Sequence, residues 1–172
     1  MSQIETLISK EKIHERIVEL ARDIDTRYQD KDLVIIGVLN GAFMFMADLV
    51  REIQTPHSID FIAVSSYVGT ESSGKVTLNK DIKVDVKDKH VLLVEDIVDT
   101  GLTISELKKM FNDRETASVA LASLLHKSVK TVHEVEIDFL GFEIEDKFVI
   151  GYGLDFDGRY RELPFIGVYS EN

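Results

Sequence analysis

The stretch VLLVEDIVDTGLT, residues 91–103, holds more functional groups than a connection between two elements needs. It starts as an apolar run and ends where a helix begins, and between them stand three carboxylates, Glu95, Asp96 and Asp99. An ionised carboxylate only accepts hydrogen bonds, so these side chains would repel a phosphate that faced them directly. They match a ligand that donates hydrogen bonds, such as a sugar diol, or a divalent cation.

The second half of this stretch has the opposite preference. Thr100, Gly101 and Thr103 stand at the start of the expected helix, where backbone N–H groups lack intrahelical acceptors and bind phosphate well. A ribose that carries a 5-phosphate would satisfy both halves, with Asp99 as a proton acceptor near the reactive side of the sugar. Helix capping is the competing interpretation for Asp99 and Thr100. It is preferred for Thr100 alone, whereas three acids so close together favour a functional site.

Alternating apolar strands and amphipathic helices must position this stretch. Near-continuous apolar runs, the pattern of strands covered on both faces, occur at 33–38, 59–64, 91–94, 117–125, 135–140 and 148–151. Helical periodicity indicates one or two helices over 4–27, and further helices over 42–53 and 102–112. This alternation predicts an α/β fold with a doubly wound parallel sheet. In such sheets ligands bind in the loops at the carboxyl ends of the strands.

Composition limits the class of protein. With 172 residues the chain is expected to form a single domain, 1–172, with a core of its own. The lack of cysteine in the sequence excludes disulfides and thiolate metal sites and fits a cytoplasmic location. No apolar run approaches the roughly eighteen residues of a membrane span, and no signal-peptide pattern opens the sequence. The net charge of −11 argues against partners such as nucleic acid or an anionic membrane, and a small phosphorylated ligand would need a metal ion and amide groups to offset it.

Residues 91–103 also resemble a known signature. Four apolar residues, two acids and then D-T-G-x-T resemble the phosphoribosyl pyrophosphate signature of the type I phosphoribosyltransferases, and the full run closely resembles their hypoxanthine-guanine branch. Other segments resemble that branch in the same order: LNGAFMFMADL its pyrophosphate loop, SSYVGT the start of its mobile loop, and LLHK, GFEIEDKFVIGYGLDF and GRYREL its purine-binding and C-terminal segments. The resemblance extends from about residue 33 to the end of the chain.

The resemblance implies an α/β core under a small hood that is built from the chain ends. It implies an enzyme that transfers the 5-phosphoribosyl group from phosphoribosyl pyrophosphate to hypoxanthine, guanine or both, forming IMP or GMP and pyrophosphate in purine salvage. It also implies a requirement for Mg²⁺. A homo-oligomer, either a dimer or a tetramer, is expected.

The same resemblance implies contacts with the purine base. Asp99 corresponds to the catalytic residue near N7, Lys127 to the lysine that reads the exocyclic oxygen, and Phe148 to the ring that stacks on the base. Val149 corresponds to a backbone contact with the base. A purine offers a π face and a carbonyl acceptor, which suits an aromatic ring and an ammonium group. Each has an ordinary alternative, because Phe148 could belong to the core and Lys127 could be a solvated strand end.

Contacts with the sugar and with pyrophosphate are implied in the same way. Glu95 and Asp96 correspond to residues that face the ribose hydroxyls, and with Asp155 they are the implied Mg²⁺ ligands, although Asp155 could simply belong to a turn. Arg161 corresponds to an arginine that reaches pyrophosphate. The remaining implied substrate contacts lie in the pyrophosphate loop, the mobile loop, and the segment around the acids and the 5-phosphate: Leu39, Asn40, Gly41, Ser66, Tyr67, Ile97, Thr100, Gly101, Leu102 and Thr103.

Asn40 departs from the pattern of the branch, in which this position is often basic. The corresponding residue contacts pyrophosphate partly through its backbone, across a cis peptide, so Asn40 is compatible with activity and Leu39–Asn40 is expected to be cis. The polar segment 65–80 is expected to act as a lid over the site, because its Gly, Ser and Thr content provides little core to anchor it.

Two alternative functions remain open from the sequence. A regulator with the same fold would bind RNA, but the charge of −11 offers no basic face and the purine-binding segment 141–156 is intact. A nearer alternative is a transferase that prefers xanthine or another base. The sequence does not rank hypoxanthine, guanine and xanthine.

Overall fold

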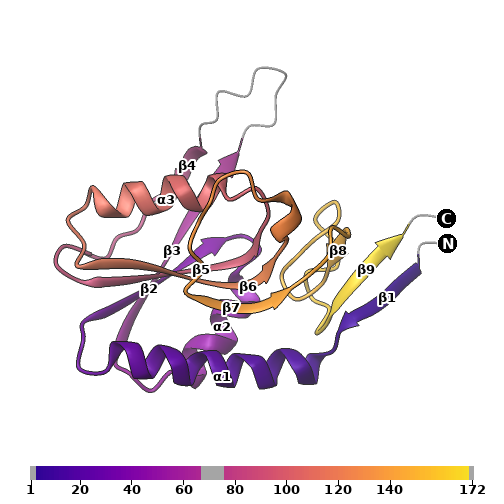
Figure 1. Ribbon diagram of the computed structural model, residues 1–172, viewed down its shortest axis with the longest axis horizontal. Coiled ribbons are helices and arrows are strands. Elements are labelled where there is room, and N and C mark those ends of the chain that lie inside the picture. The colour runs from indigo at the N-terminus through magenta and orange to yellow at the C-terminus, as the bar shows by residue number, and fades with distance from the viewer. Residues whose placement is uncertain (1–2, 67–75, 171–172) are drawn as a thin grey trace.

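The computed structural model describes residues 3–66 and 76–170, and its centre is a six-stranded sheet (Figure 1). The sheet has the order β4-β3-β2-β5-β6-β7, and every neighbouring pair is parallel except β3 with β4. Its strands are β2 Leu33–Leu39, β3 His57–Ser66, β4 Val76–Lys80, β5 His90–Val98, β6 Ser118–His126 and β7 Phe139–Glu143. The predicted α/β class with a mostly parallel sheet is confirmed.

Helices cover both faces of this sheet. α1 Lys10–Tyr28 and α2 Phe43–Glu52 lie on one face, and α3 Leu102–Asn112 lies on the other (Figure 1). Successive side chains of a strand point to opposite faces, so Leu33 and Ile35 join the core with α1 and α2, while Val34 joins the core with α3. The strands therefore read as continuous apolar runs, because both of their faces are buried.

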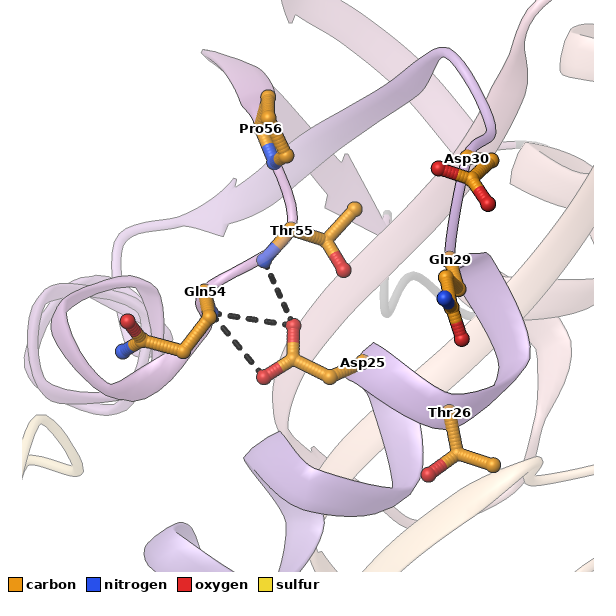
Figure 2. A pocket seen from close by; sticks show the side chains of 7 residues that line it. All are labelled: Asp25, Thr26, Gln29, Asp30, Gln54, Thr55 and Pro56. Carbon is orange, nitrogen blue, oxygen red and sulfur yellow. Dashed lines mark hydrogen bonds between the residues drawn. The ribbon is translucent and has the colours of Figure 1, made fainter.

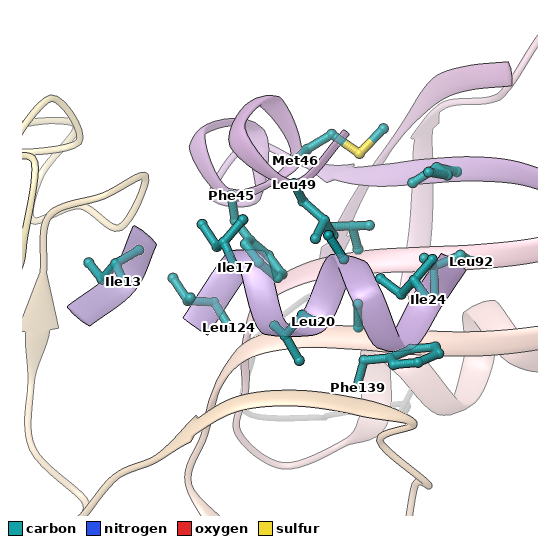
Figure 3. Close-up of a cluster of buried hydrophobic side chains, with 14 of the residues drawn as sticks. Ile13, Ile17, Leu20, Ile24, Phe45, Met46, Leu49, Leu92, Leu124 and Phe139 are labelled. Carbon is teal, nitrogen blue, oxygen red and sulfur yellow. The ribbon is translucent and has the colours of Figure 1, made fainter. Parts of the chain in front are cut away.

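α1 buries one side of its surface against α2 and the sheet. Ile13, Ile17, Leu20 and Ile24 recur every three or four residues and are at most 1% exposed, and they pack beside Phe45 and Leu49 of α2 in the cluster that Figure 3 shows. The side chain of Ser9 accepts a hydrogen bond from Lys12 N and caps the helix.

The expected helix over 4–27 is wrong at its beginning, since β1 Gln3–Ile8 is a strand. It pairs antiparallel with β9 Ile166–Ser170, and β9 pairs antiparallel with β8 Val149–Ile150. This small second sheet has the order β1-β9-β8 and joins segments from both ends of the chain beside the main sheet (Figure 1). The resemblance implied a hood, but the strands β1 and β9 were not predicted, because they pair residues more than 150 positions apart.

Two further boundaries differ from the predictions. The segment 65–80 includes β4, which forms the antiparallel edge of the sheet beside β3. The strand expected over 135–140 is displaced to β7 Phe139–Glu143, and Val135 and Ile137 instead pack against the core on the α3 side. Within the described residues, no helix is long and apolar enough to span a bilayer.

Candidate active site

The carboxyl end of the main sheet brings four loops together. A Cβ atom on Gly41, after β2, would lie only 1.6 Å from Asp96 Oδ2 at the end of β5. A Cβ on Gly153, in the hood, would lie 2.0 Å from the carbonyl oxygen of Gly41, and Gly153 has a φ of +102°. A Cβ on Gly101 would lie 2.2 Å from the carbonyl oxygen of His133, after β6. These close approaches require glycine and place the predicted pyrophosphate loop, acids and hood against one another.

Glu95 and Asp96 form an acidic pair at the end of β5. Glu95 is 7% exposed and its Oε1 accepts a hydrogen bond from Asp96 N at 3.1 Å, while Asp96 Oδ1 accepts one from Ile97 N at 2.8 Å. Burial, followed by the neighbouring charge of Asp96, raises the pKa of Glu95 well above its ordinary value. The ionised pair is therefore costly unless a cation or hydrogen-bond donors approach it.

The donor set of this pair suits a hard divalent cation. Within residues 3–66 and 76–170, no three His, Cys, Asp or Glu side chains gather into a metal-binding group. Magnesium does not require such a cage, because it is commonly held by one or two carboxylates together with water and substrate phosphates. Glu95 and Asp96 could hold it in that way.

The segment after the acids has the geometry of a phosphate cradle. Gly101, with a φ of +84°, immediately precedes α3, and Thr100 Oγ1 accepts a hydrogen bond from Leu102 N at 3.4 Å. The carbonyl oxygen of Thr100 accepts hydrogen bonds from Val132 N at 3.1 Å and His133 N at 2.9 Å, which fixes the loop from behind. The first N–H groups of α3 lack intrahelical acceptors and are available to an anion.

Asp99 does not cap this helix. Its Oδ1 is enclosed and has no hydrogen-bond partner within the described residues, and its Oδ2 lies 3.9 Å from Lys130 Nζ. At the start of α3, Leu102 N instead donates to Thr100 Oγ1. The N-cap position of α3 is Gly101, which has no side chain to cap the helix, and the Asp99 carboxylate keeps an unused acceptor, which is unusual outside functional sites.

The burial of Lys127 and Phe148 contradicts the ordinary alternatives for these residues. Those alternatives were a solvated strand end for Lys127 and a place in the core for Phe148. Lys127 follows β6, is 7% exposed rather than solvated, and directs its Nζ to Asp146 Oδ1 at 3.4 Å. Phe148 is 52% exposed rather than part of the core, and its ring meets the rings of Phe156 and Tyr169 edge-on at 5.8 and 6.2 Å. A buried cation and an open aromatic face are what a flat ligand with a carbonyl group would need.

Asp155 and Arg161 form an ion pair in the hood. Asp155 Oδ1 lies 2.8 Å from Arg161 Nη2, and Asp155 Oδ2 accepts a hydrogen bond from Gly158 N at 2.8 Å. Arg161 Nη1 donates to the carbonyl oxygen of Gly153 at 2.6 Å. Asp155 is therefore a turn residue as well as a partner for Arg161, and the pair is attached to the glycine that touches Gly41.

The remaining predicted residues lie in the loops or beyond the described part of the chain. The Leu39–Asn40 peptide is cis, as expected, and Asn40 is exposed. Val149 is buried in β8 and pairs with Val168. Ser66 is the last residue of β3, whereas Tyr67 and the rest of the expected lid up to residue 75 lie outside the described residues.

Three residues of this region had no role in the sequence prediction. Lys130 makes ion pairs with Asp99 and with Asp146, and Asp146 also pairs with Lys127. Tyr152 is buried between Gly151 and Gly153, and its hydroxyl donates to Asp48 of α2. Burial and then this hydrogen bond raise the pKa of Tyr152. Only the tyrosine between two glycines left a visible signal in the sequence.

A polar pocket at the opposite end of the sheet, where the amino ends of the strands lie, is separate from this site. It lies between the last turns of α1 and the segment before β3, and Figure 2 shows its lining residues. Asp25 accepts hydrogen bonds from Gln54 N at 3.0 Å and Thr55 N at 2.8 Å, so its carboxylate already ties α1 to that segment. The pocket adjoins the amino ends of β2 and β3, away from the loops where ligands bind such sheets.

Comparisons with known proteins agree with this arrangement. The family model of the phosphoribosyl transferase domain matches residues 4–157. The hypoxanthine phosphoribosyltransferase of Salmonella typhimurium is 44% identical over 167 residues, which cover 95% of this chain and 94% of that protein. The hypoxanthine-guanine phosphoribosyltransferase of Bacillus subtilis is 45% identical over 163 residues, covering 94% and 91%. A solved hypoxanthine-guanine phosphoribosyltransferase from Bacillus anthracis has a TM-score of 0.93 at 40% identity, covering 99% of this chain and all of that one. The chain therefore belongs to the phosphoribosyltransferase family.

Proposed function

We propose that this chain transfers the 5-phosphoribosyl group of phosphoribosyl pyrophosphate to hypoxanthine or guanine, with pyrophosphate as the second product. The observation that carries the proposal is the contrast between buried Lys127 and open Phe148, with Asp99 joined to Lys127 through Lys130 and Asp146. This arrangement suits a purine with an exocyclic carbonyl and a nitrogen that must lose a proton. The names of relatives from Salmonella typhimurium and Bacillus subtilis support the same substrates.

The base would lie against the open face of Phe148. The ammonium of Lys127 would donate to the carbonyl oxygen of hypoxanthine or guanine, whereas the amino group of adenine is itself a donor at that position. The backbone beside Val149 would complete the edge of the base pocket. Selection against adenine would follow, because two donors facing each other leave a buried charge unpaired.

The sugar phosphate would occupy the two halves of the β5–α3 loop. The N–H groups at the start of α3, with the hydroxyls of Thr100 and Thr103, would hold the 5-phosphate beside Ile97 and Leu102. Glu95 and Asp96 would accept hydrogen bonds from the ribose hydroxyls. Their negative charge would also stabilise the positive charge that develops on the anomeric carbon as pyrophosphate leaves.

Pyrophosphate would leave toward the loop of Leu39, Asn40 and Gly41. Arg161, which Asp155 and the carbonyl oxygen of Gly153 hold in place, would bind its charge through its remaining N–H groups. Mg²⁺, when bound, would neutralise the charge of the leaving pyrophosphate. Glu95, Asp96 and Asp155 are the proposed ligands; because they do not gather into one three-carboxylate group within the described residues, each would reach the ion together with water and the oxygens of pyrophosphate.

Asp99 would accept the proton that the purine loses. Its side chain is 44% exposed and Oδ2 lies 3.9 Å from Lys130 Nζ, so this oxygen is the one that a ring nitrogen could reach. Removing this acceptor should slow the chemical step without weakening the binding of phosphoribosyl pyrophosphate, since the phosphate contacts lie in the following residues.

A spectrophotometric assay with four bases tests this function. With phosphoribosyl pyrophosphate and Mg²⁺, hypoxanthine or guanine should be converted, and adenine should be about 10⁴-fold less efficient. Asp99→Ala should lower turnover by about 10²–10⁴-fold, the usual contribution of a general base. Preference for xanthine would refute the base assignment. Near-normal turnover of Asp99→Ala would refute the role of Asp99.

The alternative of an RNA-binding regulator receives no support from these relatives, whose names describe transferases. We further propose a single domain over 1–172, a homo-oligomer and a cytoplasmic location. Light scattering after gel filtration would measure the number of subunits.

A further inference from the structure

Two charged side chains that the proposed reaction does not use connect the residues around the base. Asp146 Oδ1 lies 3.0 Å from Lys130 Nζ and 3.4 Å from Lys127 Nζ. Lys130 Nζ also lies 3.9 Å from Asp99 Oδ2. The four side chains thus form a row of alternating charge, in the order Lys127, Asp146, Lys130 and Asp99, from the base-reading lysine to the proton acceptor.

Burial makes Asp146 important for the direction of Lys127. The side chain of Lys127 is 9% exposed, whereas that of Asp146 is 46% exposed. Within the described residues, Asp146 Oδ1 is the acceptor that the Lys127 ammonium contacts. A buried ammonium cannot exchange this partner freely for water, so the carboxylate determines where it points.

The backbone holds this row at both ends. Lys130 N donates to the carbonyl oxygen of Lys127 at 3.0 Å, which closes the short 3-10 turn Ser128–Lys130. Thr131 Oγ1 donates to the carbonyl oxygen of Asp99 at 3.5 Å. The hydrogen bond from Lys130 also keeps the pKa of Asp146 below its ordinary value, so its carboxylate is charged at neutral pH.

We propose that Asp146 is a positioning residue that aims the Lys127 ammonium at the carbonyl oxygen of the base, and that Lys130 couples it to Asp99. The inference rests on the proposed function, because it concerns the same base. Asp146 also lies two residues before Phe148, so one short segment supplies the stacking ring and the counter-charge of the lysine. Lys130 binds the same carboxylate oxygen, which keeps that oxygen between the two ammonium groups.

Removal of the Asp146 charge should weaken binding of the base selectively. Asp146→Asn would leave Lys127 buried without a counter-charge and Lys130 free to approach Asp99. We expect the KM for hypoxanthine and guanine to rise about five- to tenfold, since a charged hydrogen bond at a half-exposed group is lost. The KM for phosphoribosyl pyrophosphate should change less than about twofold, and kcat should change less than the base KM.

Glu145→Gln is the matched control. It removes the same charge one residue away, but Glu145 pairs with Lys147 at 2.8 Å and not with the row. Both KM values should stay unchanged in this variant. Asp146→Glu should restore most of the base affinity, because it keeps the carboxylate within reach of Lys127.

A double-variant cycle tests the coupling through Lys130. Lys130→Met alone should raise the base KM by a smaller factor, about two- to fourfold, and should add nothing in the Asp146→Asn background. Thermal unfolding of each variant checks that the fold is retained, which we expect for these half-exposed side chains.

The possible results separate the two proposals. If the native chain converts neither hypoxanthine nor guanine, the proposed function fails and this inference fails with it. If the native chain is active, an unchanged base KM in Asp146→Asn overturns the inference alone. Equal changes in the KM of base and of phosphoribosyl pyrophosphate, or the same effect in Glu145→Gln, would also overturn it, because either would indicate a general loss of structure or charge.

Discussion

At the scale of single residues, exposure distinguishes chemical roles that residue type alone leaves open. Lys127 is buried although lysine is normally solvated, and Phe148 is exposed although phenylalanine normally joins the core. Asp99 has an enclosed oxygen without a partner in the described part of the chain. These three residues with unusual exposure lie in the same group of loops. Such clustering is expected of a binding site, where side chains are arranged for a ligand.

The substitution Lys127→Ala tests specificity at this scale. Loss of a charge-assisted hydrogen bond should lower kcat/KM for hypoxanthine and guanine by about 1.5–3 kcal/mol, and adenine should lose much less, because the repulsion against its amino group is also removed. The ratio of kcat/KM for hypoxanthine and adenine measures this effect. Lys109→Ala, an exposed lysine on α3, is the control. An unchanged ratio in Lys127→Ala would mean that this lysine does not read the base.

At the scale of elements, the hood is attached to the main sheet through Tyr152. Its buried hydroxyl donates to Asp48 of α2, and the next residue, Gly153, packs against the carbonyl oxygen of Gly41. α2 begins directly after the loop of Gly41, so one hydrogen bond links the hood, the helix and the predicted pyrophosphate loop. The pair Asp155 and Arg161 is held by the same turn.

Tyr152→Phe should loosen this attachment. The free energy of unfolding should fall by about 1 kcal/mol, since the hydrogen bond is partly buried and its acceptor, Asp48, is 36% exposed and also pairs with Arg51. The KM for phosphoribosyl pyrophosphate should rise more than that for hypoxanthine, because the affected loop lies on the pyrophosphate side of the site. Urea unfolding and steady-state kinetics measure the two effects. Tyr160→Phe is the control in the same hood, since it removes a hydroxyl but keeps the ring that lies 6.0 Å from Tyr169 and leaves the Tyr152–Asp48 hydrogen bond in place.

At the scale of the whole molecule, stability in acid depends in part on Asp60 of β3. Its carboxylate accepts hydrogen bonds from Phe61 N at 2.7 Å, Lys83 N at 2.6 Å and Val84 N at 3.1 Å. Burial raises the pKa of Asp60, but these N–H groups outweigh it and lower the pKa from 3.8 to about 2. The carboxylate thereby joins β3 to the connection that leads to β5.

The sign of this pKa shift determines the pH dependence. The folded pKa is depressed, so the stabilisation is complete above the unfolded value of 3.8 and is lost as pH falls through about 2. Asp60→Asn should therefore lower the free energy of unfolding by about 1–2 kcal/mol at pH 7. The difference from the native chain should shrink between pH 4 and pH 2 in urea titrations. Asp23→Asn, an exposed residue on α1, is the control.

The sequence by itself determined the features that depend on local chemistry. The apolar runs predicted β2, β3, β5 and β6 because strands buried on both faces need continuous apolar side chains. The acids at the end of β5 and the D-T-G-x-T pattern after it predicted the site loop, because helix starts and carboxylates have fixed preferences for their ligands. The order of the matching segments predicted the family.

Only the tertiary structure decided the features that depend on partners distant in the chain. β1 is a strand because β9 pairs with it, although Ile4, Leu7 and Ile8 also suit a helix. Whether Phe148 is open or buried depends on where the hood lies. Asp146 and Lys130 look like ordinary surface charges in the sequence. They connect Lys127 with Asp99 because the turn after β6 and the segment after β7 meet at the carboxyl end of the sheet. Local patterns do not encode such meetings, since side-chain distances across a fold arise only when the elements pack.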